Sequence, residues 1–173
     1  MKLFIFLAAL GITLSPSLWA YEAGPGTINI TGKIHSDTCV LDNNNLQVDL
    51  GNINSHEFSQ KDKQSFPIHF ALNLTNCENA VSGVSVQFDG TPAKGNPALV
   101  AIDNVTGAAT GLGINIMDDQ KNTIAINSES HQYPIISGGG SNTLNFYASY
   151  MTLGDVITAG TASASVTFTL TYQ

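Results

Sequence analysis

The sequence predicts an all-β sandwich, and three observations support this fold class. Short runs that alternate apolar and polar residues recur along the chain, as expected of half-buried strands whose side chains point to opposite faces in turn. Clusters of Gly, Pro, Asn, Asp and Ser separate these runs. No stretch keeps apolar residues at helical spacing for three turns, so we expect no helix longer than a turn or two.

The first expected strand covers residues 27–35 and places Ile28, Ile30, Gly32 and Ile34 on one face. Glycine is a poor strand former, so its presence on the apolar face indicates a point where the backbone closely approaches a neighbour. The next expected strands are residues 38–41, 46–50, 67–74, 83–88, 112–117 and 143–150, with shorter candidates at 99–102 and 123–126. Polar turns or loops are expected at 42–45, 91–97, 118–122 and 138–142, and segment 118–122 links its two apolar runs like a hairpin.

The last expected strand, residues 162–172, has the clearest alternation. Its apolar face is formed by Ala162, Ala164, Val166, Phe168, Leu170 and Tyr172. We expect no later segment to pair with its free edge, and an unpaired edge invites pairing with another chain. One end of the chain would then lack a strand and the other could supply one, which is β-strand addition. The alternative is that both ends are ordinary edge strands of a complete sandwich.

Residues 1–20 have the pattern of a secretory signal peptide. Lys2 precedes an apolar run over residues 3–12, and Ala20 is a small residue at the expected cleavage site. A membrane anchor is less favoured, because the apolar run is too short to span a bilayer comfortably. We therefore expect a signal peptide at 1–20, an N-terminal extension at 21–36 and one domain at 37–173.

Charge and cysteine content narrow the possible partners. The chain has no arginine and a formal net charge of −7, which argues against nucleic-acid binding because phosphate contacts need clustered Lys and Arg. Cys39 and Cys77 are the two cysteines, and in an exported chain a single pair predicts one disulfide. In the chain-entropy model, closing the loop between Cys39 and Cys77 with a disulfide stabilises the fold by roughly 4 kcal/mol. A metal site at these cysteines is the less favoured alternative, because the four histidines show no ligand spacing.

Catalytic motifs are absent from the sequence. It contains no G-x-S-x-G turn, no H-E-x-x-H pair and no phosphate-binding glycine loop. Asp118 and Asp119 form an acidic pair in a turn, but they lack the spaced ligands of an EF-hand, so a solvated loop is favoured over a calcium site. We expect no enzyme activity, no cofactor and no metal.

Several segments together resemble one family over essentially the whole chain after residue 20. They are residues 27–34 followed by Cys39, residues 72–77, residues 111–114, residues 142–148, a glycine fourteen residues from the end (Gly160) and a penultimate aromatic (Tyr172). The last two, with alternating residues between them, are specific to subunits handled by a periplasmic chaperone. On these motifs the chain resembles the chaperone–usher pilins, and among them the minor, adaptor-type subunits of type 1 fimbriae, the FimF-like group.

The resemblance implies an incomplete immunoglobulin-like sandwich that lacks its last strand and is completed by donor-strand exchange. The implied function is that of a structural subunit of a cell-surface fimbrium that contributes to cell adhesion, with export through the periplasm. The implied partners are a periplasmic pilus chaperone, an outer-membrane usher and neighbouring fimbrial subunits. The chaperone would anchor the carboxylate of Gln173 with basic residues.

The implied site residues fall into two sets. The donor strand would use Ile28, Ile30, Gly32 and Ile34, and the chaperone and acceptor groove would use Gly160, Val166, Phe168, Leu170, Tyr172 and Gln173. The alternative function is a carbohydrate-binding fimbrial tip adhesin. It is less favoured because such adhesins carry an added lectin domain, whereas this chain has room for one domain and retains a donor strand. A secreted enzyme on a sandwich fold is less favoured still.

Overall fold

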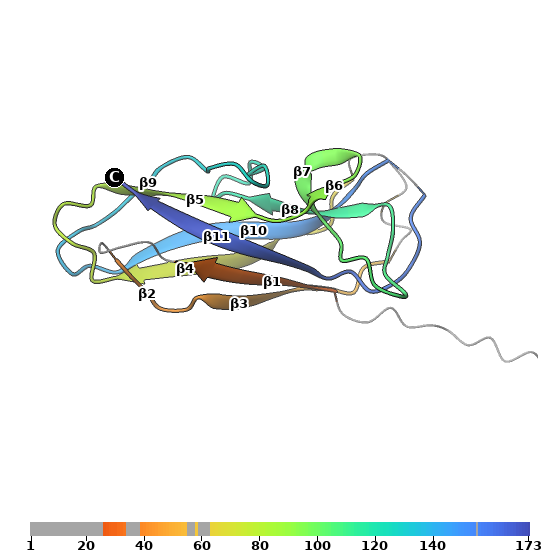
Figure 1. Ribbon diagram of the computed structural model, residues 1–173, viewed down its shortest axis with the longest axis horizontal. Coiled ribbons are helices and arrows are strands. Elements are labelled where there is room, and N and C mark those ends of the chain that lie inside the picture. Colours follow the sequence, from red (N-terminus) through yellow and green to blue (C-terminus); the bar gives the residue numbers. More distant parts are fainter. Residues whose placement is uncertain (1–25, 34–38, 55–57, 59–62, 155) are drawn as a thin grey trace, which may run out of the picture.

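The computed structural model describes residues 26–33, 39–54, 58, 63–154 and 156–173. Eleven strands are defined in these residues, and they form two sheets that face each other (Figure 1). No helix in the described part of the chain has the length and apolar character that crossing a membrane requires. The expected all-β sandwich is confirmed.

The first sheet has the strand order β3-β1-β11-β5-β9. Its strands are β1 (Gly26–Lys33), β3 (Asn45–Gly51), β5 (Gly83–Asp89), β9 (Tyr133–Pro134) and β11 (Ala164–Tyr172). The second sheet has the order β2-β4-β10-β8-β7-β6. Its strands are β2 (Val40–Leu41), β4 (Ile68–Thr75), β6 (Pro92–Ala93), β7 (Asn96–Ala101), β8 (Leu112–Met117) and β10 (Asn142–Thr152).

The strand β11 lies inside its sheet, with β1 on one side and β5 on the other. The expectation that its edge is bare is therefore wrong for this conformation, because β1 of the same chain fills the position. The pairing of β1 with β11 is parallel, and its pairing with β3 on the other side is antiparallel. Figure 1 shows β1 between these two neighbours.

The core lies between the two sheets and is aromatic at its centre. The rings of Phe88 and Phe146 meet edge to face with centroids 5.3 Å apart, and Phe70 stacks on Phe146 at 5.5 Å. These geometries are preferred by aromatic pairs in protein interiors. Both sheets contribute, since Phe88 comes from β5 and Phe146 from β10.

The strand prediction differs from the structure in three places. Residues 123–126 form no strand, because Ile124 N donates to Ile116 O and Ile126 N donates to Ala98 O, which are separate neighbours rather than one ladder. The expected loop at 91–97 instead contains β6 and the start of β7. The short β9 was not predicted, since two residues are too few to show alternation.

Candidate functional site

The candidate site is the groove that β1 fills, formed by the apolar faces of β11 and β3. The side chains of Ile28 and Ile30 are completely buried in it. Ile28 is paired with Ala164 on one side and Val48 on the other, and Ile30 is paired with Val166 and Leu46. The groove is therefore lined by apolar side chains at alternate positions of both flanking strands.

Main-chain hydrogen bonds hold β1 on both edges, which is why the strand direction and register are defined. The parallel ladder runs from Ile28 opposite Ala164 to Lys33 opposite Thr169. Beyond the ladder with β3, Gly32 N donates to Asn44 O at 3.0 Å. The Thr31 hydroxyl faces away from the core and donates to Val166 O at 3.3 Å.

Gly32 lies at a point of the groove that has no room for a side chain. A Cβ built on this residue would overlap the end of the Phe168 ring. Phe168 is completely buried and packs against Phe88, with ring centroids 6.5 Å apart, so its ring has little room to move. The close approach expected from a glycine on the apolar face is therefore present, and the neighbour is Phe168.

The C-terminal end of β11 is less buried than its middle. Leu170 is buried, whereas Tyr172 is partly exposed and packs against the edge of the core. Burial raises the pKa of Tyr172, and its hydroxyl has no hydrogen-bond partner among the described residues. The backbone oxygen of Gln173 accepts from Ser82 N at 2.7 Å and from Gly83 N at 3.1 Å.

Gly160 lies outside β11 and packs against backbone. A Cβ at this position would overlap the backbone of residues 107–109. Gly160 also lines an apolar pocket at the end of the groove where β1 begins, together with Gly26, Phe58 and Ile157. The groove thus continues beyond the first residue of β1.

Tyr150 is a residue of this pocket that the sequence analysis did not single out. Its hydroxyl donates to Ala162 O at 3.1 Å and lies where a Cβ on Gly26 would be. Burial, and then the charge of Asp49, raise the pKa of Tyr150 to about 12. The alternation of the predicted strand 143–150 places Tyr150 on the same face as Phe146, so its burial could have been inferred, but its partner could not.

The remaining candidate residues fall into three groups. Cys39 and Cys77 form a disulfide, which fixes β2 to the end of β4. Phe146 faces the core, whereas Tyr147 points to the other side of β10, where Lys121 Nζ lies 5.3 Å from its ring centroid. Ile34 lies outside the described residues, so its expected place in the donor strand stays a prediction.

Comparison with known proteins gives one family. The family model described as "Fimbrial protein" matches residues 28–173. The chain is 36% identical to the uncharacterized fimbrial-like protein YcbV of Escherichia coli, covering 96% of this chain and 95% of the relative. It is 31% identical to the long polar fimbria protein A of Salmonella typhimurium (100% and 98% covered) and 30% identical to the fimbrial-like protein FimF of the same organism (98% and 97%).

Two solved structures show the same architecture. The Burkholderia pseudomallei antigen and type I fimbria protein BPSL1626 superposes with a TM-score of 0.62 at 34% identity, covering 86% of this chain and 99% of the other. A subunit of a chaperone–usher pilus superposes with a TM-score of 0.64 at 19% identity, covering 99% and 100%, which supports the fold alone. The sandwich described above is therefore the immunoglobulin-like fold of these proteins.

Proposed function

The chain belongs to the fimbrial protein family and is a structural pilus subunit, and we propose that it polymerises by inserting β1 into the groove of a neighbouring subunit. The observation that carries this proposal is the position of β1. It is an N-terminal strand with its own apolar face, and it lies in a groove built entirely by later segments of the chain. The same contacts could be made by an equivalent strand of a second copy or a related subunit.

Burial of the isoleucines supplies much of the affinity expected for such a strand. Ile28 and Ile30 are both completely buried, and each would contribute roughly 1.5–3 kcal/mol on leaving water. Main-chain pairing with both β11 and β3 adds affinity, while the alternate side-chain sites set the register. A groove without a strand would expose this apolar surface and two unpaired edges, so we expect it to be occupied at every stage.

The tether to the domain explains the parallel direction of β1 in its own groove. Only six peptide steps separate Lys33 from Cys39, a reach of about 20 Å. Cys39 is bonded to Cys77, and Figure 1 shows β2 at the same end of the molecule as the C-terminus of β11. An antiparallel β1 would end beside Ala164, about 26 Å away along β11, beyond that reach. A strand from another molecule has no such restriction.

The family resemblance extends the proposal to the assembly pathway. We propose that the subunit is exported through the periplasm, that a pilus chaperone occupies the groove there, and that an outer-membrane usher accepts the complex. The cell-surface position in a pilus follows from the family itself. A head-to-tail contact of this kind uses two different surfaces and does not close on itself, so it generates a filament.

A deletion of residues 27–35 tests the proposal. The shortened chain should expose the groove and be soluble only when a strand is supplied in trans. A synthetic peptide of residues 26–35 should bind it one to one and raise its thermal unfolding temperature. A matched control peptide with Ile28→Thr and Ile30→Thr keeps the strand propensity but loses the apolar anchors, and it should not bind.

A second measurement separates donor from acceptor roles. When the two chains are mixed, β1 of the full-length chain should fill the groove of the shortened chain and give a heterodimer. The shortened chain alone should form no fibres visible by electron microscopy. The proposal fails if the shortened chain is a stable monomer that ignores the peptide, or if it still enters fibres at the rate of the full chain.

A further inference from the structure

Most of the exposed large apolar side chains in the described residues lie at the two ends of the sandwich. Val105 is 53% exposed and Val156 is 86% exposed, in the loops before β8 and before β11. Val40 is 53% exposed and Ile136 is 68% exposed, in β2 and in the segment after β9. The remaining one, Phe66, precedes β4 and belongs to neither pair. Figure 1 shows the loop before β11 at one end of the sandwich and β2 at the other.

The first pair lies at the end of the sandwich where β1, β8 and β11 begin, which we call the entry end. Ala109 N donates to Thr161 O at 2.8 Å, which joins the loop before β8 to the loop before β11. A Cβ on Gly111 would lie 2.8 Å from Val156 O, so the two loops also touch there. Val105 and Val156 are therefore carried by one connected surface, and the loop before β11 also lines the pocket at the end of the groove.

The second pair lies at the end that holds β2 and the C-terminus, which we call the disulfide end. Val40 follows Cys39, which is bonded to Cys77. Asn142 Oδ1 accepts from Ile136 N at 2.7 Å, and Asn142 Nδ2 donates to Ile136 O at 3.0 Å. The same Nδ2 lies 3.5 Å from Cys77 Sγ. Both apolar residues are therefore anchored through the disulfide, where the tether to β1 also begins.

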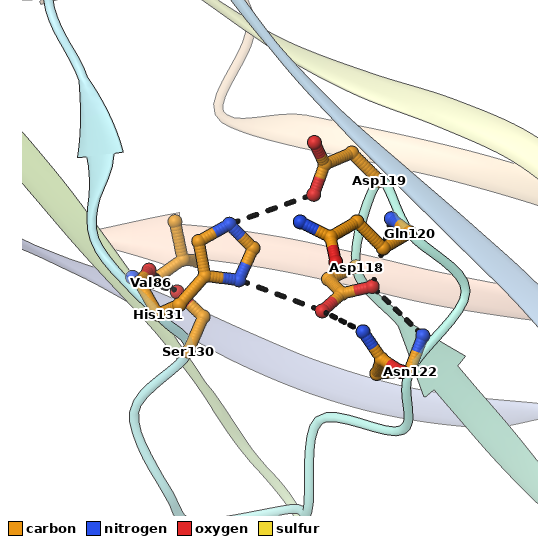
Figure 2. A network of polar contacts seen from close by, with 7 residues as sticks. All are labelled: Val86, Asp118, Asp119, Gln120, Asn122, Ser130 and His131. Atoms are coloured by element: carbon orange, nitrogen blue, oxygen red, sulfur yellow. Dashed lines mark hydrogen bonds and ion pairs between the residues drawn. The ribbon is translucent and has the colours of Figure 1, made fainter.

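The acidic turn after β8 has its partners within the molecule. His131 Nδ1 lies 3.5 Å from Asp118 Oδ2, and His131 Nε2 lies 3.5 Å from Asp119 Oδ1 (Figure 2). Asp118 Oδ1 also accepts from Gln120 N at 2.9 Å and from Asn122 N at 2.8 Å. The chain carries a formal net charge of −7, so two copies repel each other. A contact between copies is therefore favoured by the burial of apolar side chains rather than by charge.

The tether determines which ends of two subunits can meet. A subunit that donates β1 keeps its disulfide end within about 20 Å of the point where the inserted strand ends. If that strand ran parallel to β11, it would end at the disulfide end of the acceptor, where the acceptor's own tether begins. Successive subunits would then crowd their disulfide ends at one place, and the filament could not extend. A strand antiparallel to β11 ends at the entry end instead, so each disulfide end meets the entry end of the next subunit.

We propose that Val40 and Ile136 of one copy pack against Val105 and Val156 of the next copy, as a second contact beside the inserted strand. This inference rests on the proposed function and adds a partner surface to it. The contact is continuous with the groove, because the loop before β11 lines the pocket at its end. It joins two different surfaces, so it extends a filament without closing it. On contact the four exposed side chains leave water, which favours association.

Two charge substitutions in the purified full-length chain test this contact. Val156→Glu and Ile136→Lys each place a charge where the proposal places apolar neighbours. Each should raise the rate at which preformed fibres release subunits in urea by about tenfold, because a charge that leaves water without a partner is costly. The initial rate of assembly should stay unchanged, because it is limited by the release of β1 from its own groove. Light scattering measures both rates.

Combined variants and a matched control show whether the two ends face each other. Val156→Glu with Ile136→Lys places opposite charges on the two ends and should recover most of the lost fibre stability. Val156→Glu with Ile136→Glu places like charges there and should not. Gln47→Glu adds the same charge at an exposed position of β3 and should leave the release rate unchanged. All three positions are exposed, so the monomers should unfold at the wild-type temperature.

The possible results separate this inference from the proposed function. If the wild-type chain forms no fibres, the insertion of β1 into a neighbour fails, and the contact between ends fails with it. If fibres form but Val156→Glu and Ile136→Lys release subunits at the wild-type rate, the contact is overturned while the proposed function stands. The contact is also overturned if Val156→Glu with Ile136→Lys is no more stable in fibres than the single variants.

Discussion

At the scale of single residues, Gly32 sets how tightly a strand can lie in the groove. Adding one methyl group would normally stabilise a strand slightly, by about 0.4–1 kcal/mol through the unfolded state. Here the new Cβ would overlap the buried ring of Phe168, and overpacking costs about 1–3 kcal/mol. The overlap with Phe168 therefore outweighs the gain, and the net effect of adding a side chain at residue 32 is to destabilise the fold.

We predict that Gly32→Ala lowers the free energy of unfolding by about 1–2 kcal/mol and that Gly32→Leu lowers it further. Urea denaturation of the purified chain measures both. Asn29→Ala, on the outward face of the same strand, is the control and should change stability by less than about 0.5 kcal/mol. Equal stability of Gly32→Leu and wild type would show that β1 does not lie against Phe168.

Tyr150 makes stability depend on alkaline pH. The pKa of Tyr150 is raised to about 12 by burial and by Asp49, so its neutral form stabilises the fold fully below the unfolded pKa of 10.0. That contribution is lost as the pH rises from about 10 to about 12. Tyr133 and Tyr172, whose pKa values are also raised by burial, contribute to the same decline.

We predict that Tyr150→Phe costs about 1 kcal/mol near pH 8, because the hydrogen bond to Ala162 O is lost. The difference from wild type should shrink or reverse at about pH 11, because the Tyr150 hydroxyl is then mostly ionised in the unfolded chain (pKa 10.0) but not in the folded one (pKa about 12), which lowers the stability of wild type alone. Urea denaturation at both pH values measures this. A constant difference across the range would contradict the assignment.

At the scale of elements, the disulfide links β2 to the end of β4 and sets where the tether to β1 begins. Cys39 and Cys77 are both buried and are separated by 38 residues. We predict that Cys39→Ala with Cys77→Ala lowers the free energy of unfolding by roughly 4 kcal/mol. Urea denaturation measures the loss, and alkylation followed by mass measurement checks the starting state. Two free thiols in the exported wild-type protein would refute the bond.

Sequence alternation predicted the long strands and the apolar faces of β1 and β11 because half-buried strands repeat every two residues. It failed for residues 123–126, where Ile124 and Ile126 alternate inward but Asn127 has a φ of 63° and no ladder forms. It also missed β9, which has two residues. The contact between Asp118 and His131 depends on the turn after β8 and the segment before β9 meeting across the sheets. No local pattern in the sequence encodes that meeting.

The groove and a strand able to fill it were both predicted, and in this structure β1 of the same chain occupies the groove. Ile28, Ile30 and Gly32 indicated a strand able to fill a groove, and Val166 and Phe168 indicated a strand with a groove beside it. Periodicity identifies complementary faces but carries no information on whether the two strands belong to one chain. The segment between Lys33 and Cys39 is long enough to allow parallel insertion into the same domain.

At the scale of the whole molecule, insertion of β1 into its own groove competes with assembly. A strand tethered by six peptide steps acts at a high effective concentration, so exchange must wait until β1 leaves. Assembly without other factors should therefore be limited by a step inside one molecule. We expect its initial rate per subunit to be nearly independent of protein concentration.

We predict that a covalent link between β1 and β11 abolishes assembly reversibly. Asn29 and Ser165 are direct neighbours in the parallel ladder, and strands about 4.8 Å apart are within the range that a disulfide can join. The double variant Asn29→Cys, Ser165→Cys should stay monomeric when oxidised, as measured by light scattering, and should assemble after reduction. The two single variants serve as controls for the new thiols. Reduced wild type serves as the control for loss of the Cys39–Cys77 bond. If the oxidised double variant forms fibres at the wild-type rate, β1 is not the strand that is exchanged.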